Sequence, residues 1–395
     1  MASKPLFRFG TYNLLDLEIP KTAEHKQRYD RLVAGITATY RGRTGMLGVQ
    51  ELLGDTRQDA RRLLRMLAED TGMRCEATPA GREKPVPALA SQALGASVHR
   101  YHVGLLWTED VEPIAGTMRA YEGGTDFWHA MVSLDVCTDG VERSRWCSYH
   151  GNPFSPDRRL HEAYRVLGVF QDPKVPGGVA ADWNALSAAR RADGSYYDAE
   201  PYLDQHHRKV RYQAVFDLDR PNAPQLADRR SSEFLQRGPG GLMDPVAALD
   251  APWEASCGYW VNGQGRSDDF GLRRIDVPKV TEDLVRTCGP AQRTVGRKQT
   301  SPPTTGWSPA TWFWRNGAPR REAVHAPRAV VGHDRRPGRG LGPPPRAVAA
   351  ARPTARARLP PAGREHRRPV RRHRGAGRRG RLALDRPGHP FPRRG

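Results

Sequence analysis

Cysteine is scarce in this sequence and widely scattered. The five cysteines form no Cys-x-x-Cys pair and no cluster with histidine, and their number is odd. This pattern excludes the ligand spacing of common zinc sites and argues against a disulfide framework, so we expect reduced thiols in a cytoplasmic protein. Long apolar runs are also missing: no stretch of about 18 apolar residues could form a transmembrane helix, and the N-terminus lacks the apolar segment of an export signal. We therefore expect no membrane span. The sequence also gives no sign of an obligate protein partner.

Positive charge has an uneven distribution along the chain. The formal net charge is +20, but residues 301–395 contain 23 arginines, no lysine and four acidic residues, which makes +19. The first 300 residues contain 40 basic and 39 acidic side chains and are almost neutral. The high total charge therefore says nothing about the substrate of the part that can fold.

Apolar residues in the first 185 positions alternate between strand-like and helix-like patterns. Residues 60–68 give the clearest helix, because their apolar side chains recur at i, i+3, i+4, i+7 and i+8. Other helices are expected over 25–40 and 158–170. Strands are expected over 6–15, 46–52, 103–107, 131–136, 146–150, 179–184 and 272–280. This alternation predicts an α/β fold with two packed sheets and helices on the outside.

Composition divides the chain into a folded part and a tail. Residues 1–288 are expected to form one domain, in which the polar stretch 186–265 is a lid-like insertion over the sheet ends. Residues 289–395 form a basic tail of low complexity, rich in Arg, Pro and Gly. Such a composition cannot bury a core, so the tail is expected to be disordered or out of frame.

Polar residues stand at the ends of four expected strands. A side chain at a strand end is held by a rigid sheet and faces a cleft lined by loops, which is where chemistry is usually placed. These residues are Asn13, Gln50, Glu51, His150, Asp182 and Asn184.

The order of these strand-end motifs resembles the endonuclease/exonuclease/phosphatase superfamily, over roughly residues 6–285. The resemblance implies a four-layer αββα sandwich that hydrolyses a phosphoester or phosphodiester with the help of Mg²⁺ or Mn²⁺. Phosphate esters are then the expected substrates, with nucleic acid among the candidates. A hard cation suits this reaction because it neutralises the negative charge that protects a phosphodiester from attack.

The resemblance also implies a role for each matched residue. Glu51 matches the carboxylate that holds the metal, and Asn13 would support the metal or a phosphate oxygen. Asp182 would orient the attacking water. Asn184 would hold a phosphate oxygen through its amide, and His150 would contact the phosphate or the leaving oxygen.

Asp276 completes the expected site. It ends the segment 274–276, which matches the strand where the family places an aspartate that orients a catalytic histidine. Two other motifs are set aside. Residues 267–269 resemble a damaged Ser-Asp-His motif but precede Asp276 rather than follow it, and the pair 206–207 is better explained as two solvated loop histidines.

The Ser-Asp-His motif expected after Asp276 is missing from the chain. The codons of residues 301–314, read from the third base of each, permit Pro-Ser-Asp-His followed by an alternating apolar strand. A tail with 23 arginines and no lysine resembles GC-rich DNA translated out of frame. We therefore hypothesise that a frameshift between residues 276 and 301 replaced the native C-terminus. Hydrolysis by this chain is then expected to be impaired, since loss of a positioned acid or base typically costs about 100- to 10,000-fold.

Two alternatives remain open. The chain could be a nonspecific nucleic-acid binder that contacts phosphates through its arginine-rich tail. It could also be a catalytically inactive scaffold that keeps the sandwich. A salt-dependent affinity that disappears when residues 301–395 are deleted would favour the first alternative. Background activity after the frame is restored would favour the second.

Overall fold

The computed structural model describes most of the first 287 residues and one later strand, all of them in the compact unit Met1–Ala323. The described ranges are 6–81, 90–138, 141–203, 211–215, 219, 223–237, 240–258, 270–287 and 310–315. The histidine pair 206–207, the segment 267–269 and the rest of the basic tail lie outside them.

One sheet has five strands in the order β16-β1-β2-β6-β5. The strands are β1 (Leu6–Leu17), β2 (Gly45–Leu53), β5 (Leu94–Gly95), β6 (Tyr101–Trp107) and β16 (Ala310–Arg315). Strands β1 and β2 are parallel, and the other neighbours are antiparallel. The sheet is therefore mixed, with its parallel pair at the centre.

The second sheet has seven strands in the order β14-β15-β11-β10-β9-β7, and β8 also pairs with β9. The strands are β7 (Glu112–Pro113), β8 (Arg119–Tyr121), β9 (Ala130–Thr138), β10 (Val141–His150), β11 (Gly177–Asp182), β14 (Leu242–Met243) and β15 (Lys279–Thr281). It too has a central parallel pair, β10 and β11. Two short hairpins stand outside the main sheets: β3 (Glu76–Ala77) with β4 (Ser91–Gln92), and β12 (Ala214–Val215) with β13 (Leu226–Ala227).

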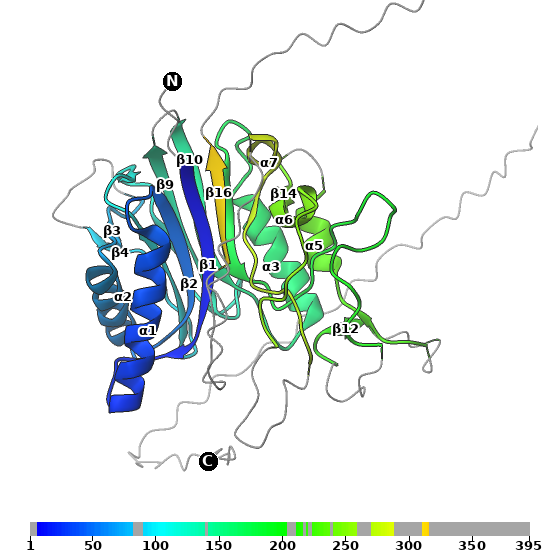
Figure 1. Cartoon of the computed structure of the whole chain (residues 1–395), viewed down its shortest axis with the longest axis horizontal. Helices are drawn as coiled ribbons and strands as arrows, with labels where there is room; N and C mark the ends of the chain where they lie inside the picture. The colour runs from blue at the N-terminus through cyan, green and yellow to red at the C-terminus, as the bar shows by residue number, and fades with distance from the viewer. Residues whose placement is uncertain are drawn as a thin grey trace, which may run out of the picture. The chain divides into compact units, whose positions relative to one another are not determined.

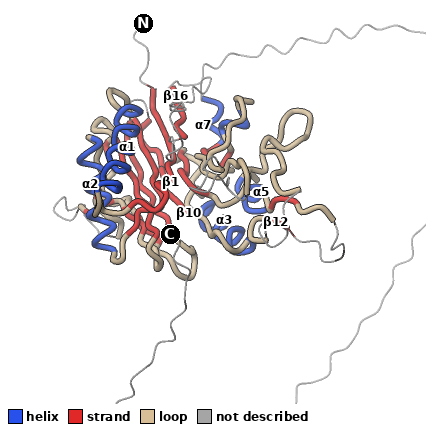
Figure 2. Tube along the Cα trace, turned by 60° about the horizontal axis from the view of Figure 1, so that its bottom comes forward, coloured by secondary structure: helices blue, strands red, loops and turns tan. Residues whose placement is uncertain are grey.

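Helices cover the outer faces of the two sheets, with the strands between them (Figures 1 and 2). Helices α1 (Ala23–Tyr40) and α2 (Arg57–Thr71) cover the first sheet, and α3 (Pro156–Gly168) and α5 (Arg230–Leu235) cover the second. Two short helices follow, α6 (Pro245–Ala248) and α7 (Glu282–Thr287). The four-layer αββα sandwich expected from the sequence is confirmed. No helix in these described ranges is both long and apolar enough to cross a bilayer.

Aromatic side chains fill the space between the two sheets. The rings of Phe7 and Phe9, on β1, lie 5.0 and 4.4 Å from the indole of Trp146 on β10. Trp146 and Trp107 are almost fully buried in the same cluster. Aromatic rings bury large apolar areas and gain further from offset contacts, so this layer holds the sheets face to face.

Helix α2 shows why the periodic segments form their helices. Thr56 accepts a hydrogen bond from the backbone N–H of Asp59, and the Asp59 carboxylate accepts from the Thr56 backbone in return. This reciprocal cap satisfies two of the N–H groups that every helix start leaves unpaired. Gly72 ends the helix at a φ of 70°. The five apolar residues predicted to share one face are all buried.

Three regions differ from the expectations or refine them. The strand expected over 272–280 is regular only at Lys279–Thr281, because Ser256 Oγ accepts the backbone N–H groups of Ile275 and Asp276 that a regular ladder would use. The insertion 186–265 supplies α5 to the outer layer and β14 to a sheet edge. Residues 310–315 form β16 beside β1, where no strand was expected. Three of these six residues are aromatic, and aromatic side chains favour strands.

Candidate active site

The central strands of both sheets end at the edge of the sandwich where the site lies. Asn13 is opposite Gln50 in the parallel pair β1–β2, and His150 is opposite Asp182 in the parallel pair β10–β11. His150 and Asp182 end their strands, whereas β1 and β2 continue past Asn13 and Glu51 to Leu17 and Leu53, with a register irregularity between Asn13 and Leu17. Each sheet therefore brings polar residues of a parallel pair to the same edge. The two sheets are joined just beneath the site, because Gln50 Nε2 donates to Ser148 Oγ at 3.1 Å.

Glu51 is held in one orientation by two donors. Its Oε1 accepts from Asn13 Nδ2 at 2.9 Å, and its Oε2 accepts from the backbone N–H of Asp16 at 2.9 Å. Glu51 has a φ of 61°, a left-handed conformation that disfavours a residue with a Cβ. Such strain persists only where the surrounding structure enforces it, and it is commonly stored at functional sites.

Asn13 joins the two sheets by bridging two carboxylates. Its Nδ2 also donates to Asp182 Oδ2 at 2.9 Å, while its Oδ1 accepts from the backbone N–H of Leu15. The Leu15 contact fixes which way the amide points. Asn13 therefore positions Glu51 and Asp182 as a donor, and its Oδ1, which accepts one hydrogen bond from Leu15, keeps a second lone pair.

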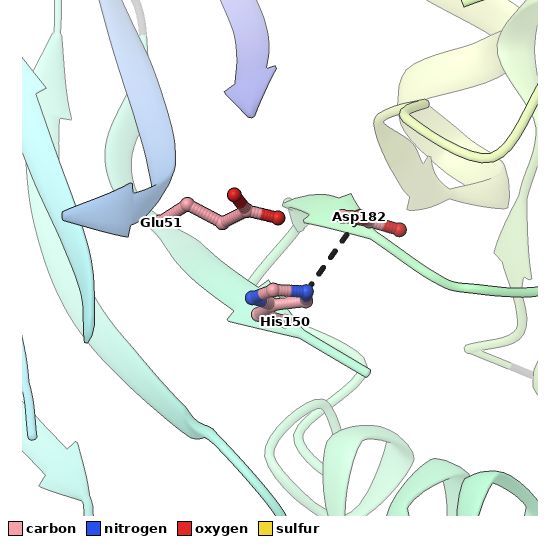
Figure 3. Close-up of side chains that lie close together, drawn as sticks. All are labelled: Glu51, His150 and Asp182. Atoms are coloured by element: carbon pink, nitrogen blue, oxygen red, sulfur yellow. Dashed lines mark ion pairs between the residues drawn. The ribbon is translucent and has the colours of Figure 1, made fainter. Parts of the chain in front are cut away.

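His150 approaches the same aspartate. Its Nε2 lies 3.6 Å from Asp182 Oδ2. One ligand atom each from Glu51, His150 and Asp182 lie within 4.8 Å of one another. Figure 3 shows that the Glu51 carboxylate comes from β2 and faces the two side chains of the second sheet. The spacing is that of a group able to surround a cation.

Asn184 adopts a left-handed conformation as well, with a φ of 48°. Its backbone N–H donates to Asp182 Oδ1 at 2.8 Å, and its Nδ2 donates to the carbonyl of Gly151 at 3.0 Å. Asn184 thus fixes Asp182 and ties β11 to the loop after β10. Among the described residues, the second amide hydrogen of Asn184 has no acceptor, so it can donate to a ligand.

Asp276 lies beside Asp182 through an isolated antiparallel bridge. Ser256 Oγ donates to its Oδ2 at 2.9 Å. Its Oδ1 is buried and has no hydrogen-bond partner in the described part of the chain. A buried carboxylate oxygen without a donor is costly, so this atom points to a missing cationic or hydrogen-bonding group.

Burial dominates the electrostatics of the site. It raises the pKa of Glu51, raises the pKa of Asp182 to about 6, and raises the pKa of Asp276 well above its usual value, with the Asp182 charge adding to the last. Burial also lowers the pKa of His150 to about 4, against the attraction of Glu51. Three acids that resist ionisation and a neutral imidazole form a site that gains stability from an added cation.

The six residues that were given site roles from the sequence, all but Gln50 of those named there, come together at this edge. Three further residues support them and were not predicted. The ring of His129 stacks on His150 with centroids 4.0 Å apart, Ser256 holds Asp276, and Glu162 anchors the neighbouring loops. Of these three residues, only His129 had a sequence signal, because it is a polar residue close to the start of an expected strand. The other two partners lie far from the site motifs in sequence.

No family model matches the chain, and no curated protein matches it by sequence. Solved structures do match. An endonuclease/exonuclease/phosphatase family protein from Bacteroides thetaiotaomicron has 13% identity and a TM-score of 0.43, over 79% of this chain and 98% of that chain. An AP endonuclease from Archaeoglobus fulgidus has 13% identity and a TM-score of 0.46, over 78% and 99%. A mannosyl-6-phosphatase from Bacteroides thetaiotaomicron has 13% identity and a TM-score of 0.43, over 78% and 98%. The chain is thus similar to structures that carry the name of the family its strand-end motifs resemble.

Proposed function

We propose that this protein is a hydrolase of phosphoesters or phosphodiesters that uses Mg²⁺ or Mn²⁺. The observation that carries the proposal is the cluster of Glu51, His150 and Asp182, whose ligand atoms lie within 4.8 Å of one another. The cluster brings together three of the residues whose motifs resemble those of the family. A phosphate ester is the substrate that this combination of buried acids, amides and a neutral histidine fits.

The donor set fits a hard divalent cation. Carboxylate oxygens are the ligands that Mg²⁺ and Mn²⁺ prefer. Burial raises the pKa values of Glu51 and Asp182, and Asp276 Oδ1 has no hydrogen-bond partner among the described residues. These are the signs of acids buried without enough positive charge. Glu51 would hold the cation, with Asn13 keeping its carboxylate in place. When bound, the cation supplies charge neutralisation for the phosphate group.

The remaining residues act on water and phosphate. Asp182 accepts hydrogen bonds and would orient the attacking water towards phosphorus. Asn184 would donate its free amide hydrogen to a phosphate oxygen. His150 is neutral near pH 7 because burial lowers its pKa to about 4, so it would contact the phosphate by hydrogen bonding rather than by charge. Asp276 would orient the histidine that the frameshift hypothesis removes from this chain.

Glu51→Gln tests the assignment of the metal ligand. The substitution keeps the shape of the side chain but removes the negative charge, so we expect loss of Mg²⁺-dependent thermal stabilisation and at least a 100-fold loss of any hydrolysis. The measurements are a thermal shift titration with MgCl₂ and turnover of bis(p-nitrophenyl) phosphate. Glu109→Gln is the matched control, because the Glu109 side chain is 86% exposed in a surface ion pair. Equal Mg²⁺ shifts and equal turnover in Glu51→Gln and the parent would refute the metal assignment.

A further inference from the structure

Four aromatic side chains form a continuous row beside the candidate active site. The His99 and Trp128 rings lie 4.4 Å apart, Trp128 and Phe154 lie 5.8 Å apart, and Phe154 and Tyr212 lie 5.7 Å apart. We call His99, Trp128, Phe154 and Tyr212 the aromatic row. They come from four loops far apart in sequence, so tertiary structure alone brings them together.

The row lies at the same edge of the sandwich as the catalytic cluster. Strand β9 begins at Ala130 opposite His150, and β6 begins at Tyr101 opposite Leu53, just after Glu51. The loops that carry His99 and Trp128 therefore enter the sheets where β2 and β10 leave them. Phe154 lies four residues after His150, the last residue of β10.

A single ring joins the row to the cluster. His129 stacks on His150 at 4.0 Å with an interplanar angle of 14°. The same His129 ring meets His99 edge-on at 6.2 Å. A group bound at His150 is thus one ring away from the first member of the row.

Glu162 braces the row from beneath. This glutamate is 1% exposed, and its carboxylate accepts from the backbone N–H of Trp128 at 2.6 Å and of Asn152 at 2.9 Å. It also accepts from the hydroxyl of Tyr149 at 2.6 Å. Burying a carboxylate is expensive unless several donors satisfy it, and here two of the donors belong to the loops that present Trp128 and Phe154. The loops are therefore held in place rather than left to drift.

The row remains open to ligands and has positive charge at one end. Phe154 is 54% exposed, although a phenylalanine side chain is more stable when buried. The guanidinium of Arg211 lies 4.5 Å from the centre of the Tyr212 ring, and Arg211 is itself exposed. Solvent-accessible rings with a neighbouring arginine are features that bind the bases and the backbone of single-stranded nucleic acid.

We propose that the aromatic row stacks the bases of a nucleotide-containing substrate, so that the preferred phosphodiester belongs to a single-stranded nucleic acid. This inference rests on the proposed function, because it places the scissile phosphate at the cluster of Glu51, His150 and Asp182. A flat π-face accepts any base, so the row selects single strands over duplexes without selecting a sequence. Paired bases inside a duplex would not be free to stack on it.

The test is binding of two labelled oligomers to the full chain in EDTA, measured by fluorescence anisotropy. One is a short oligothymidylate, and the other has the same length and phosphates but no bases. Any contact of the arginine-rich tail with phosphates would be common to both oligomers, so the ratio of the two affinities isolates the contribution of the bases. We expect the parent to prefer the base-bearing oligomer, and Phe154→Ala to lower its affinity for that oligomer alone by about 5- to 100-fold.

Three further variants keep the test decisive. Phe154→Tyr keeps a ring and should keep the preference, and Trp128→Ala should lower it. Tyr164→Ala, which removes an aromatic side chain 57% exposed on α3, should change neither affinity. Equal binding of both oligomers by the parent, or an equal loss for both in Phe154→Ala, would overturn the inference.

Competition and turnover separate the remaining possibilities. Displacement of the oligothymidylate by thymidine monophosphate at similar concentration would assign the row to free nucleotides, and weak displacement would assign it to strands. Better displacement by a hexose phosphate than by thymidine monophosphate would overturn the inference. A base preference without Mg²⁺-dependent turnover in the frame-restored protein overturns the proposed function alone. Turnover of bis(p-nitrophenyl) phosphate without a base preference overturns this inference alone.

Discussion

At the residue scale, the buried lysine Lys279 shows how strongly burial in this fold changes a pKa. Lys279 on β15 is 1% exposed, and its ammonium donates to Ser232 Oγ at 3.1 Å. Burial lowers its pKa to about 8, with the Asp244 carboxylate opposing the shift. Between pH 8 and about 10.4, the value for an unfolded lysine, the unfolded chain binds more protons than the folded one. The free energy of unfolding therefore rises with pH across that window. Below pH 8 the lysine is charged in both states, and the buried ammonium destabilises the folded state to its full extent.

Lys279→Met tests this linkage. The variant lacks the titrating group, so only the parent gains stability from loss of this proton. The free energy of unfolding of the variant minus that of the parent should therefore be largest below pH 8. It should fall by about 3 kcal/mol between pH 8 and pH 10.5. Urea unfolding of both proteins at a series of pH values measures the difference, and groups common to both cancel. A difference that stays constant from pH 7 to pH 10 would show that Lys279 titrates normally.

At the scale of the elements, close approach of the two sheets brings the candidate site residues of β2 and β11 together. A Cβ added at Gly48 on β2 would lie 2.4 Å from the Cβ of Ala180 on β11. Only a residue without a side chain fits between these strands. The contact lies just before Gln50 and Glu51, so the sheet separation directly controls the distance between Glu51 and Asp182.

Gly48→Ala should therefore reduce both stability and site function. Forcing a methyl group into this contact is expected to cost about 1 to 3 kcal/mol of unfolding free energy and to weaken the Mg²⁺-dependent thermal shift. Gly35→Ala on α1 is the matched control, since nothing lies within 4 Å of its added Cβ. That change should stabilise the protein by about 0.5 to 1 kcal/mol. Unchanged urea midpoints for Gly48→Ala would contradict the packing argument.

The cap of α2 gives a second prediction for an element. Thr56→Ala removes the hydroxyl that caps the helix and is expected to cost about 1 kcal/mol. Because α2 packs on the face of the first sheet away from the site, the Mg²⁺-dependent thermal shift should persist in the variant. Urea unfolding and the MgCl₂ titration measure the two effects. Loss of the Mg²⁺ shift together with the cap would instead link α2 to the geometry of the site.

At the scale of the whole molecule, the question is whether this sequence contains every residue that the proposed hydrolysis needs. Asp276 has a carboxylate oxygen without a partner in the described residues, and the Ser-Asp-His motif expected after it is missing from the sequence. The strand β16 lies beside β1 at the edge of the first sheet. The codons of residues 301–314, read from the third base of each, permit Ser-Asp-His followed by a strand in this part of the chain.

Restoring that frame should increase turnover of bis(p-nitrophenyl) phosphate by about 100- to 10,000-fold, the usual contribution of a positioned acid or base. Resequencing codons 276–315 comes first, because it shows whether a base is inserted or missing. The control is a restored protein whose new histidine is replaced by alanine. Equal turnover in all three proteins would favour the inactive-scaffold alternative.

The sequence alone predicted the longer helices and strands of the first 185 residues and named most residues of the candidate site. Helical and strand periodicity depend on near neighbours, so α2, β2 and β10 were predicted within a few residues. The strand-end motifs were equally local, which is why Glu51, His150 and Asp182 could be named in advance. Even so, the segment before β15 was predicted as regular strand, because the competing Ser256 hydroxyl lies about twenty positions earlier in the chain.

Tertiary structure decided how those residues meet. The bond from Asn13 to Asp182 spans 169 positions, and the stack of His129 on His150 depends on the register of β9 against β10. The aromatic row is assembled from four separate loops, and no local pattern marks any of its members as a partner of another. Contacts over such separations are set by sheet order, register and the distance between layers, and these are properties of the packed molecule rather than of any segment of the chain.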